Sequence, residues 1–497
     1  MRILYCDVDT LRADHTGPYG YSRAITPNLD AIAAGGVVID SCYASDSPCA
    51  PSRAAWTSGQ FGITTGAIGN FGPAADIGMF TRTRHAPFFG NHLYRNGIHT
   101  ASVTSFPERH YAYWFLANFL EWVKPSLSGG DDEDAADVTA MAESWLRRRG
   151  RDDDWFLHVH YWDAHIPYME QRPYFELAEA AGEPPAWPDE EAIALHARMY
   201  GPHSALDLYE GDGSWRVPPP RSPNPVTMPD AITSRADFVK LVTGYDGAIA
   251  YWDHHLGRLL DVLADLGVLD DTAVIVTSDH GECFGENGCY GDHPMANEPS
   301  HHVPLVIRWP GITDGVPEAR RHAPGLVSHV DICPTICELL DIPVPGGWDG
   351  ESFAPAVRGE EYAGRDYVVL SHGAYTYQRA IRTPESLYIR TLHPGCFKLD
   401  REQLYDIATD PHMTQNLVSQ KAATAAELAG RLEQWRLEHA TMAGPTPDPM
   451  EARRYEGPAD AFDVKAYLTR LRLTDRGDLA DDLERRLGEG WVTRAKW

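Results

Sequence analysis

The stretch "RILYCDV", residues 2–8, is an apolar run of strand length, and it leads through a polar turn into "TPNLDAIAAGG", residues 26–36. The second stretch starts on Thr-Pro and stops on Gly-Gly, which is typical of a helix. Further apolar runs, separated by helical or Pro/Gly-rich segments, are "HTASVTS" (99–105), "WFLHVHYWD" (155–163), "TAVIVTSD" (272–279) and "VPLVIRW" (303–309). Strands that alternate with helices predict an α/β fold with a large, mostly parallel sheet flanked by helices.

The chain of 497 residues is too long for one small core, and its texture changes after about residue 365. The runs "DYVVLS", "SLYIRTL" and "EQLYDI", followed by the helical pattern "AATAAELAGRLEQWRLEHA", predict a small antiparallel sheet and a helix. We expect a main α/β domain at 1–365, a C-terminal α+β subdomain at 366–445, and a tail at 446–497 that packs on the main domain or on a neighbouring subunit. Residues 126–153 and 181–232 are expected to be excursions from the core.

Composition limits the classes of partner. Acidic side chains outnumber basic ones by 71 to 43, so the formal net charge is −28, and nucleic acid is disfavoured as a partner. No window approaches the ~18 consecutive apolar residues of a membrane span, and a strand-like run follows the first two residues directly, so neither a span nor a signal peptide is expected. The sequence therefore predicts a cytoplasmic protein. Its 8 cysteines lack CxxC spacing, which indicates neither a zinc ribbon nor a disulfide framework.

Acidic side chains and a histidine close two of the apolar runs. Asp7 and Asp9 end the first run, on one face of an extended chain, and Asp279 and His280 end "TAVIVTSD". In open α/β sheets the site lies outside the carboxyl ends of the strands. Each of these residues alone could cap a loop, but together they predict a site for a divalent cation, whose charge would offset the repulsion between the carboxylates.

The segment "DSPCAPSRAAWTSG", residues 46–59, places Cys49 between two prolines, which favours a loop over a packed core position. The five residues "CAPSR" (49–53) resemble the C-x-P-S-R signature of the type I sulfatases in the alkaline phosphatase superfamily. Further resemblances to that family, which together cover roughly residues 1–440, are "DTLRADHTGPYGY" (9–21), "YWDAHIPY" (161–168), "TSDHGECFGENG" (277–288) and "EQLYDIATDPHMTQNL" (402–417).

The resemblance implies an alkaline phosphatase-like fold with a mixed sheet, and a catalytic sulfatase-like domain at 1–365. It also implies that a maturation enzyme oxidises Cys49 to formylglycine, reading the motif before folding is complete. The hydrated aldehyde would be the nucleophile, with Arg53 reaching back to it. The implied cation is Ca²⁺, and the implied ligands are Asp7, Asp9, Asp279, His280 and the modified Cys49.

Two departures from the family pattern concern charge. Thr10 stands where most members have a second aspartate, and Asp7 is the nearest replacement. Ser105 aligns with a lysine of the family pattern, and Arg109 and His110 lie close by as substitutes. His293 lies near the position of a second family lysine, later in the chain. His165 matches the family's general acid or sulfate ligand. The charge clamp on the sulfate is thus expected to consist of imidazole and guanidinium groups.

Three functions compete at this point. The first is hydrolysis of a sulfate monoester, either a sulfated sugar or an aryl or alkyl sulfate. The second is a phosphonate monoester hydrolase or phosphodiesterase on the same scaffold, which would favour Mn²⁺. The third, a non-catalytic binding protein, is disfavoured by the intact motif and carboxylates. No membrane partner is expected, and a homo-oligomer is compatible with the tail.

Overall fold

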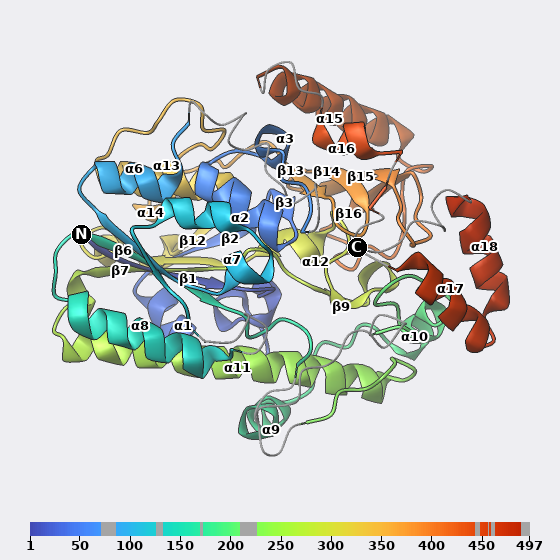
Figure 1. Ribbon diagram of the computed structural model, residues 1–497, viewed down its shortest axis with the longest axis horizontal. Coiled ribbons are helices and arrows are strands. Elements are labelled where there is room, and N and C mark those ends of the chain that lie inside the picture. Colours follow the sequence, from blue (N-terminus) through green and yellow to red (C-terminus); the bar gives the residue numbers. More distant parts are fainter. Residues whose placement is uncertain are drawn as a thin grey trace.

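The computed structural model describes residues 1–70, 86–125, 133–168, 172–208, 226–442, 448–455, 457–458 and 463–488. Within these residues the main sheet has nine strands (Figure 1). Their spatial order is β10 (His302–Val303), β2 (Val37–Tyr43), β11 (Leu305–Arg308), β7 (Thr272–Thr277), β1 (Arg2–Val8), β6 (Trp155–Tyr161), β4 (His99–Val103) and β5 (Glu121–Val123), with β12 (His322–Ser328) paired to β2.

Most strand pairs of this sheet are parallel. β1 runs parallel to β6 and β7, β4 runs parallel to β5 and β6, and β12 runs parallel to β2. β11 is antiparallel to β2 and β7, and β10 is antiparallel to β2. The predicted fold class, a large mixed and mostly parallel sheet, is confirmed.

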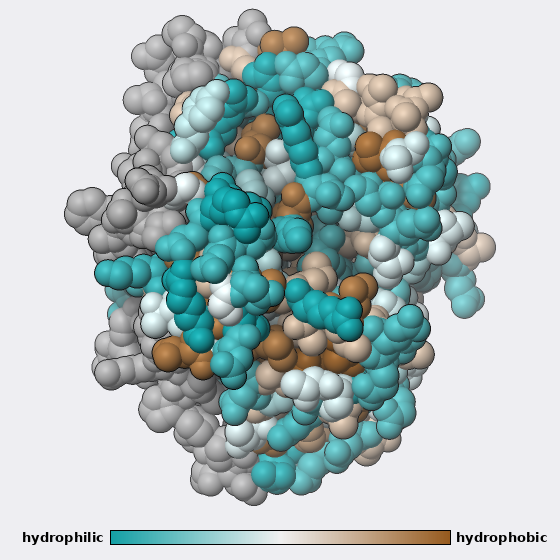
Figure 2. All heavy atoms as spheres, turned by 90° about the vertical axis from the view of Figure 1, so that its right-hand side faces the viewer, coloured by the Kyte–Doolittle hydropathy of each residue, from teal (hydrophilic) through white to brown (hydrophobic). Residues whose placement is uncertain are grey.

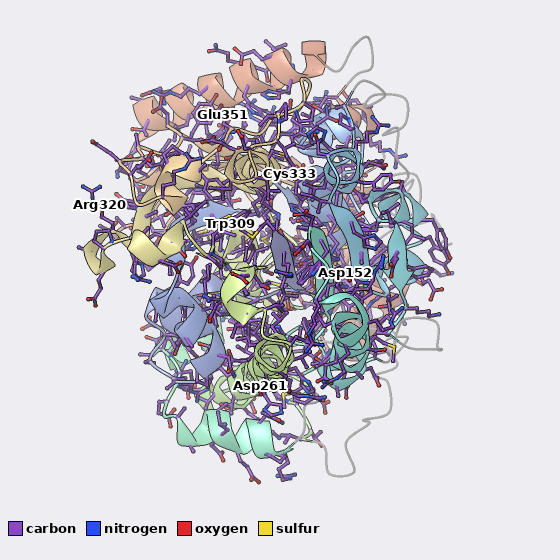
Figure 3. All side chains as sticks on the ribbon, turned by 90° about the vertical axis from the view of Figure 1, so that its left-hand side faces the viewer. Asp152, Asp261, Trp309, Arg320, Cys333 and Glu351 are labelled. Carbon is purple, nitrogen blue, oxygen red and sulfur yellow. The ribbon has the colours of Figure 1, made fainter. Side chains whose placement is uncertain are left out.

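Helices cover both faces of the sheet (Figure 1). One face is covered by α1 (Pro27–Ala34), α8 (Ala135–Arg149) and α11 (Arg235–Asp265), and the other by α2 (Cys49–Ser58), α6 (Phe89–Arg95), α13 (Ile332–Leu339) and α14 (Ala354–Val357). Each layer buries a separate apolar cluster against the sheet. Trp309 and Cys333 lie in the second of these clusters, whereas Arg320 is exposed and points outward (Figure 3).

The expectation that residues 126–153 leave the core is wrong for α8. The helix buries Ala135, Val138, Ala142, Trp145 and Leu146. These positions recur every three or four residues, so they form one apolar face while the charged residues between them face outward. The charge of the segment concealed this periodicity. Residues 126–132 lie outside the described part.

A second sheet carries the C-terminal subdomain. Its strand order is β16 (Glu402–Asp406), β15 (Ser386–His393), β14 (Tyr377–Arg382), β13 (Val368–His372) and β3 (Asp46–Ser47). The first four strands are antiparallel, as predicted, and α15 (Ala422–Met442) packs on them. β3 joins parallel to β13 and directly precedes α2. The subdomain therefore supports the chain at the entrance to the Cys49 helix.

The remaining α-helices and strands of the described residues are α3 (Gly62–Thr65), α7 (Phe106–Arg109), α9 (Arg172–Ala180), α10 (Glu190–His196), the hairpin β8 (Cys283–Phe284) and β9 (Tyr290–Asp292), α12 (Glu298–His301), α16 (Pro449–Arg453), α17 (Val464–Leu473) and α18 (Gly477–Leu487).

The C-terminal helices pack on both the main domain and the C-terminal subdomain. α17 and α18 share an apolar cluster with Tyr200 and Cys396, and Arg476 donates to Asp207 at 2.7 Å. The face of the molecule that carries these helices is largely hydrophilic, with apolar residues in small patches (Figure 2). Among the residues described, no helix is both long and apolar enough to cross a membrane.

Candidate active site

Cys49 is the first residue of α2, a helix whose ten residues are all buried. Pro48 precedes the helix, and Pro51 lies in its first turn, where a missing backbone N–H breaks no helical hydrogen bond. The prolines that favoured a loop in the sequence therefore mark a helix start. The thiol is 1% exposed, and burial with the nearby Asp9 and Asp279 raises the pKa of Cys49 well above its usual range.

Four adjacent strands bring the predicted site residues together. β7, β1, β6 and β4 are neighbours in the sheet, and they run parallel. Asp9 follows β1, Asp279 and His280 follow β7, His165 follows β6, and His110 follows α7 after β4. The carboxyl ends of these strands meet at one edge, where α2 also begins. This is the location that the sequence predicted.

The Arg53 guanidinium, 1% exposed, is surrounded by three carboxylates. Its Nε donates to Asp7 at 2.8 Å, and its Nη1 donates to Asp9 at 3.2 Å and to Asp279 at 2.7 Å. The guanidinium carbon also lies 4.9 Å from the ring centroid of Phe106. One positive charge faces three negative ones, so this buried centre has an excess of negative charge that a divalent cation would balance.

Four side chains form a group that suits a cation. Asp9, Cys49, Asp279 and His280 each offer a ligand atom, and these atoms lie within 4.8 Å of one another. Cys49 Sγ is 3.4 Å from Nε2 of His280, and Oδ1 of Asp9 is buried without a hydrogen-bond partner among the described residues. Burial and the neighbouring Asp9 and Asp7 raise the pKa of Asp279 well above its usual range despite Arg53. The donor set therefore fits a divalent cation, which would relieve this repulsion.

Asp7 and Thr10 lie differently from the predicted ligand set. Asp7 is outside the four-residue group, and its Oδ2 accepts from Arg53 and lies 3.3 Å from Nε2 of His158. Thr10 donates its hydroxyl to the carbonyl of Ala164 at 2.6 Å. The contacts of Asp7 favour a role in holding Arg53 over the predicted role as a cation ligand, which stays a prediction.

Two predicted histidines lie beside this group. The ring centroid of His293 is 3.9 Å from that of His280 and 5.9 Å from that of His165. A ring nitrogen of His293 is also within 4.8 Å of the ligand atoms of Cys49 and His280. His165 donates from Nδ1 to the carbonyl of Ile166 at 2.6 Å, so its Nε2 is the nitrogen left for other partners. Burial and the His280 ring lower the pKa of His293 well below its usual range.

Arg109 and His110 lie on the segment after β4. The Arg109 guanidinium stacks 4.0 Å from the ring centroid of Trp162, whose Nε1 donates to Ser105 at 2.7 Å. Both ring nitrogens of His110 are buried and without a hydrogen-bond partner among the described residues. Burial and Arg109 lower the pKa of His110 well below its usual range. Two donor groups therefore face the same end of the sheet as Cys49.

Several residues of the site were missed in the sequence. His158 and His160 on β6 lie beside Asp7 and Asp9, and each binds a hydroxyl through Nδ1, at 2.8 Å to Ser102 on β4 and at 2.9 Å to Thr104 just after it. The alternation in "WFLHVHYWD", which puts two histidines on one face of a strand, was the available signal. His203 had no such signal, because it lies on an irregular segment.

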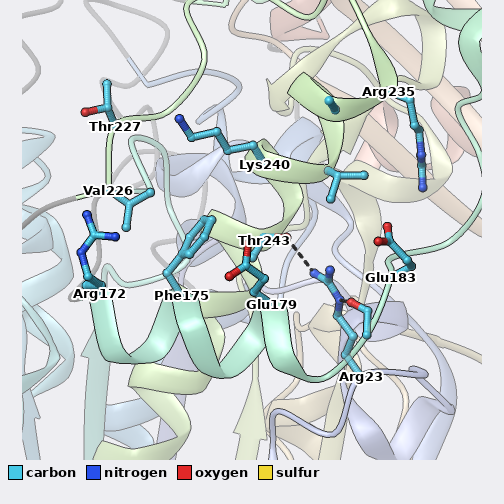
Figure 4. Close-up of a pocket in the computed structure, with 13 residues that line it drawn as sticks. Arg23, Arg172, Phe175, Glu179, Glu183, Val226, Thr227, Arg235, Lys240 and Thr243 are labelled. Atoms are coloured by element: carbon cyan, nitrogen blue, oxygen red, sulfur yellow. Dashed lines mark hydrogen bonds between the residues drawn. The ribbon is translucent and has the colours of Figure 1, made fainter.

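A cavity of about 820 Å³ lies between α9 and α11, apart from these residues (Figure 4). Its lining includes the acidic residues Glu179 and Glu183 and the basic residues Arg23, Arg172, Arg235 and Lys240. Arg23 donates hydrogen bonds to the carboxylate of Asp246 and to the carbonyl of Gly182, both at 2.7 Å. The lining contains none of the residues that surround Cys49.

Comparison with known proteins agrees with this geometry. The sequence profile of the sulfatase family matches residues 3–342, and the profile described as N-sulphoglucosamine sulphohydrolase, C-terminal, matches residues 285–438. The chain belongs to the sulfatase family, whose members are sulfuric ester hydrolases.

The chain is similar to the choline-sulfatase of Rhizobium meliloti, with 28% identity over 81% of this chain and 78% of the relative. It is 25% identical to the multifunctional alkaline phosphatase superfamily protein PehA of Trinickia caryophylli, over 84% of this chain and 90% of the relative. The fold is shared with the phosphonate monoester hydrolase of Agrobacterium radiobacter, with a TM-score of 0.68 and 23% identity over 88% of this chain and 96% of that one.

Proposed function

We propose that the protein hydrolyses sulfate monoesters through a formylglycine diol derived from Cys49, with a divalent cation at the same centre. The observation that carries the proposal is the position of Cys49 at the start of a buried helix, with ligand atoms of Asp9, Asp279 and His280 within 4.8 Å. Choline-sulfatase among the relatives supports a sulfated small molecule, and a sulfated sugar or aryl sulfate is equally compatible with the site.

A diol nucleophile can release sulfate by breaking its own C–O bond, so the reaction needs no second attack at sulfur. One geminal hydroxyl loses its proton and attacks sulfur, the S–O bond to the alcohol breaks, and the alcohol oxygen takes up a proton. The second hydroxyl then loses its proton and becomes the carbonyl oxygen, while the C–O bond to sulfate breaks and its electron pair leaves with sulfate. Water adds to the aldehyde and restores the diol, so one water is consumed for each ester.

Burial of Cys49 constrains when it can be modified. The side chain is 1% exposed, and the whole helix around it is covered. A maturation enzyme could reach the thiol only before α2 has packed against the sheet. This agrees with a partner enzyme that reads "CAPSR" as an extended segment.

The proposed cation is Ca²⁺, held by Asp9, Asp279, His280 and the modified residue 49. When bound, it would neutralise the carboxylates and polarise a sulfate oxygen. Arg53 would keep the two aspartates in place, while Arg109 and His110 bind the sulfate oxygens with their donor groups. His293 would donate a proton to the leaving oxygen, and His165 would bind the sulfate.

A phosphonate monoester or phosphodiester is the second candidate substrate. The imidazole in the ligand group favours this alternative, because nitrogen ligands suit Mn²⁺ better than Ca²⁺. The fold shared with a phosphonate monoester hydrolase supports this alternative at the level of the scaffold.

Parallel assays decide between the two. We expect protein made with its maturation enzyme to hydrolyse an aryl sulfate faster, at equal concentration, than a phenyl phosphonate monoester or a phosphodiester. Exhaustive chelation should abolish turnover, and added Ca²⁺ should restore it better than Mn²⁺. A higher kcat/KM for the phosphonate together with better rescue by Mn²⁺ would transfer the proposal to the second substrate class.

Substitution of the two histidines should separate proton donation from sulfate binding. Burial and the His280 ring lower the pKa of His293 well below its usual range, and the carboxylate of Asp292 at 3.3 Å opposes this shift, whereas His165 is backed by a neutral carbonyl. A bound sulfate ester would add negative charge and favour protonation further.

We therefore expect His293→Asn to slow an alkyl sulfate by about 10²- to 10⁴-fold and an aryl sulfate by less than about tenfold, since phenoxide leaves without help. His165→Asn should slow both substrates equally. The opposite pattern would assign the proton donor to His165.

A further inference from the structure

Two buried side chains, Asp292 and His203, form a chain of contacts that begins at the ring of His293. Nδ1 of His293 lies 3.3 Å from Oδ1 of Asp292, and Oδ2 of the same carboxylate lies 2.8 Å from Nε2 of His203. The backbone N–H of His293 also donates to Oδ1 of Asp292 at 2.6 Å. All three side chains are buried, and they come from two separate segments of the chain.

This arrangement favours one tautomer of His293. An ionised carboxylate only accepts hydrogen bonds, so a proton on Nδ1 is the form that Asp292 can stabilise, although the 3.3 Å contact falls outside hydrogen-bond geometry in this structure. Burial would raise the pKa of Asp292, but His203 and His293 hold it well below its usual range. His203 supplies the partner that a second buried carboxylate oxygen requires.

We propose that His203, acting through Asp292, is a positioning residue that fixes the orientation and tautomer of His293. The proposal deepens the proposed function, on which it rests, because it assigns the support of the group that serves the leaving oxygen. It also gives a role to a segment, residues 201–208, that no sequence motif marks.

The segment with His203 is itself held from two sides. The backbone N–H of Tyr290, on β9, donates to the carbonyl of His203 at 2.8 Å, and Ser204 bridges to Cys289. His203 has a φ of +57°, a conformation that costs energy for a residue with a side chain and persists only where surrounding contacts impose it.

The second support comes from the C-terminal helices. The backbone N–H of Gly201 donates to the Tyr467 hydroxyl at 2.8 Å. Tyr467, Arg470 and Arg476 in turn donate to the carboxylate of Asp207, at 2.9, 2.7 and 2.7 Å. α17 and the turn after it therefore bind both ends of the segment that contains His203, at Gly201 and at Asp207.

A matched pair of variants tests the proposal. His203→Leu and His203→Gln meet the same backbone cost at positive φ, but only glutamine keeps an N–H donor for Asp292. We expect His203→Leu to lower kcat for an alkyl sulfate by about 10- to 100-fold, with KM within about twofold and a smaller loss on an aryl sulfate. His203→Gln should recover most of the alkyl rate.

His196→Leu is the control. His196 is also buried and also contacts β9, but its Nδ1 lies 2.6 Å from the Tyr290 hydroxyl and not beside Asp292. It should change stability without separating the two substrates. Equal losses on both sulfates in His203→Leu, or equal behaviour of the leucine and glutamine variants, would overturn the proposal.

Crystal structures of the variants give a readout independent of turnover. The His293 ring should turn away from Asp292 in His203→Leu and stay in place in His203→Gln, and an unmoved ring in the leucine variant rejects the proposal. If the unsubstituted protein hydrolyses no sulfate ester, the proposed function fails, and the ring position still decides the role of His203. If His203→Leu does not fold, Asp292→Asn replaces it in both measurements, with the same expected outcomes.

Discussion

We expect Cys49→Ala to abolish turnover, with a loss of at least about 10⁴-fold in kcat, because the proposed covalent adduct forms on this residue. The protein should remain folded, since removing one buried sulfur costs on the order of 1 kcal/mol. Turnover of an aryl sulfate and a thermal melt measure the two effects. In the unsubstituted protein, peptide mass spectrometry should find the decrease in mass that accompanies conversion of the Cys49 thiol to an aldehyde.

Cys42→Ala is the matched control. Cys42 is equally buried, on β2, and burial raises the pKa of its thiol as well, but it lies outside the ligand group. Its substitution should leave the rate within about twofold. Undiminished activity in Cys49→Ala would end the formylglycine proposal, whereas an unmodified thiol in protein from a host without the maturation enzyme would show only that maturation had not occurred.

The second large effect is expected for Asp9→Asn, which should lose the bound cation and more than about 100-fold of activity together. The amide keeps the size of the carboxylate but carries no charge, and Asp9 contributes to both the ligand group and the pair with Arg53. Metal content by mass spectrometry and the aryl sulfate rate are measured on the same sample. Excess cation should restore part of the rate.

Asp7→Asn and Thr10→Ala show whether Asp7 is a ligand. Asp7 accepts from Nε of Arg53 at 2.8 Å and lies outside the ligand group. Asp7→Asn should therefore retain the cation and lose activity because Arg53 loses a charged partner. Thr10→Ala should be mild, since the Thr10 hydroxyl donates to a backbone carbonyl. Loss of the cation in Asp7→Asn would restore Asp7 to the ligands, and loss of the cation in Thr10→Ala would assign that role to threonine.

Periodicity was sufficient to predict the main sheet, because each of its central strands is a continuous apolar run bounded by turn residues. It was insufficient for α8, where a charged outer face concealed an apolar face that includes Trp145 and Leu146. The small sheet was predicted from residues 366–407, but the addition of β3 to it was not. A two-residue strand has no pattern of its own, and it forms only where another edge is available.

The chemical inventory of the site could be predicted from strand ends and one motif. Asp9, Asp279 and His280 each follow a recognisable strand, and Cys49 was found through its motif, although its flanking prolines predicted a loop where the structure has a helix start. Spacing could not decide whether Asp7 or Thr10 faces the cation, because both are near Asp9 in sequence. Their hydrogen bonds to Arg53 and Ala164 separate them in the folded chain.

The sequence by itself determined the order of strands and helices along the chain, the sulfatase motif, and most of the residues proposed to bind a cation, since these depend on local periodicity and residue type. Only the tertiary structure decided which charges meet around Arg53 and which residues support His293. Contacts such as that between His203 and Asp292, or between Tyr467 and Gly201, join segments far apart in the chain. Such contacts arise when separate elements pack and bury their polar groups together, and no local pattern records them.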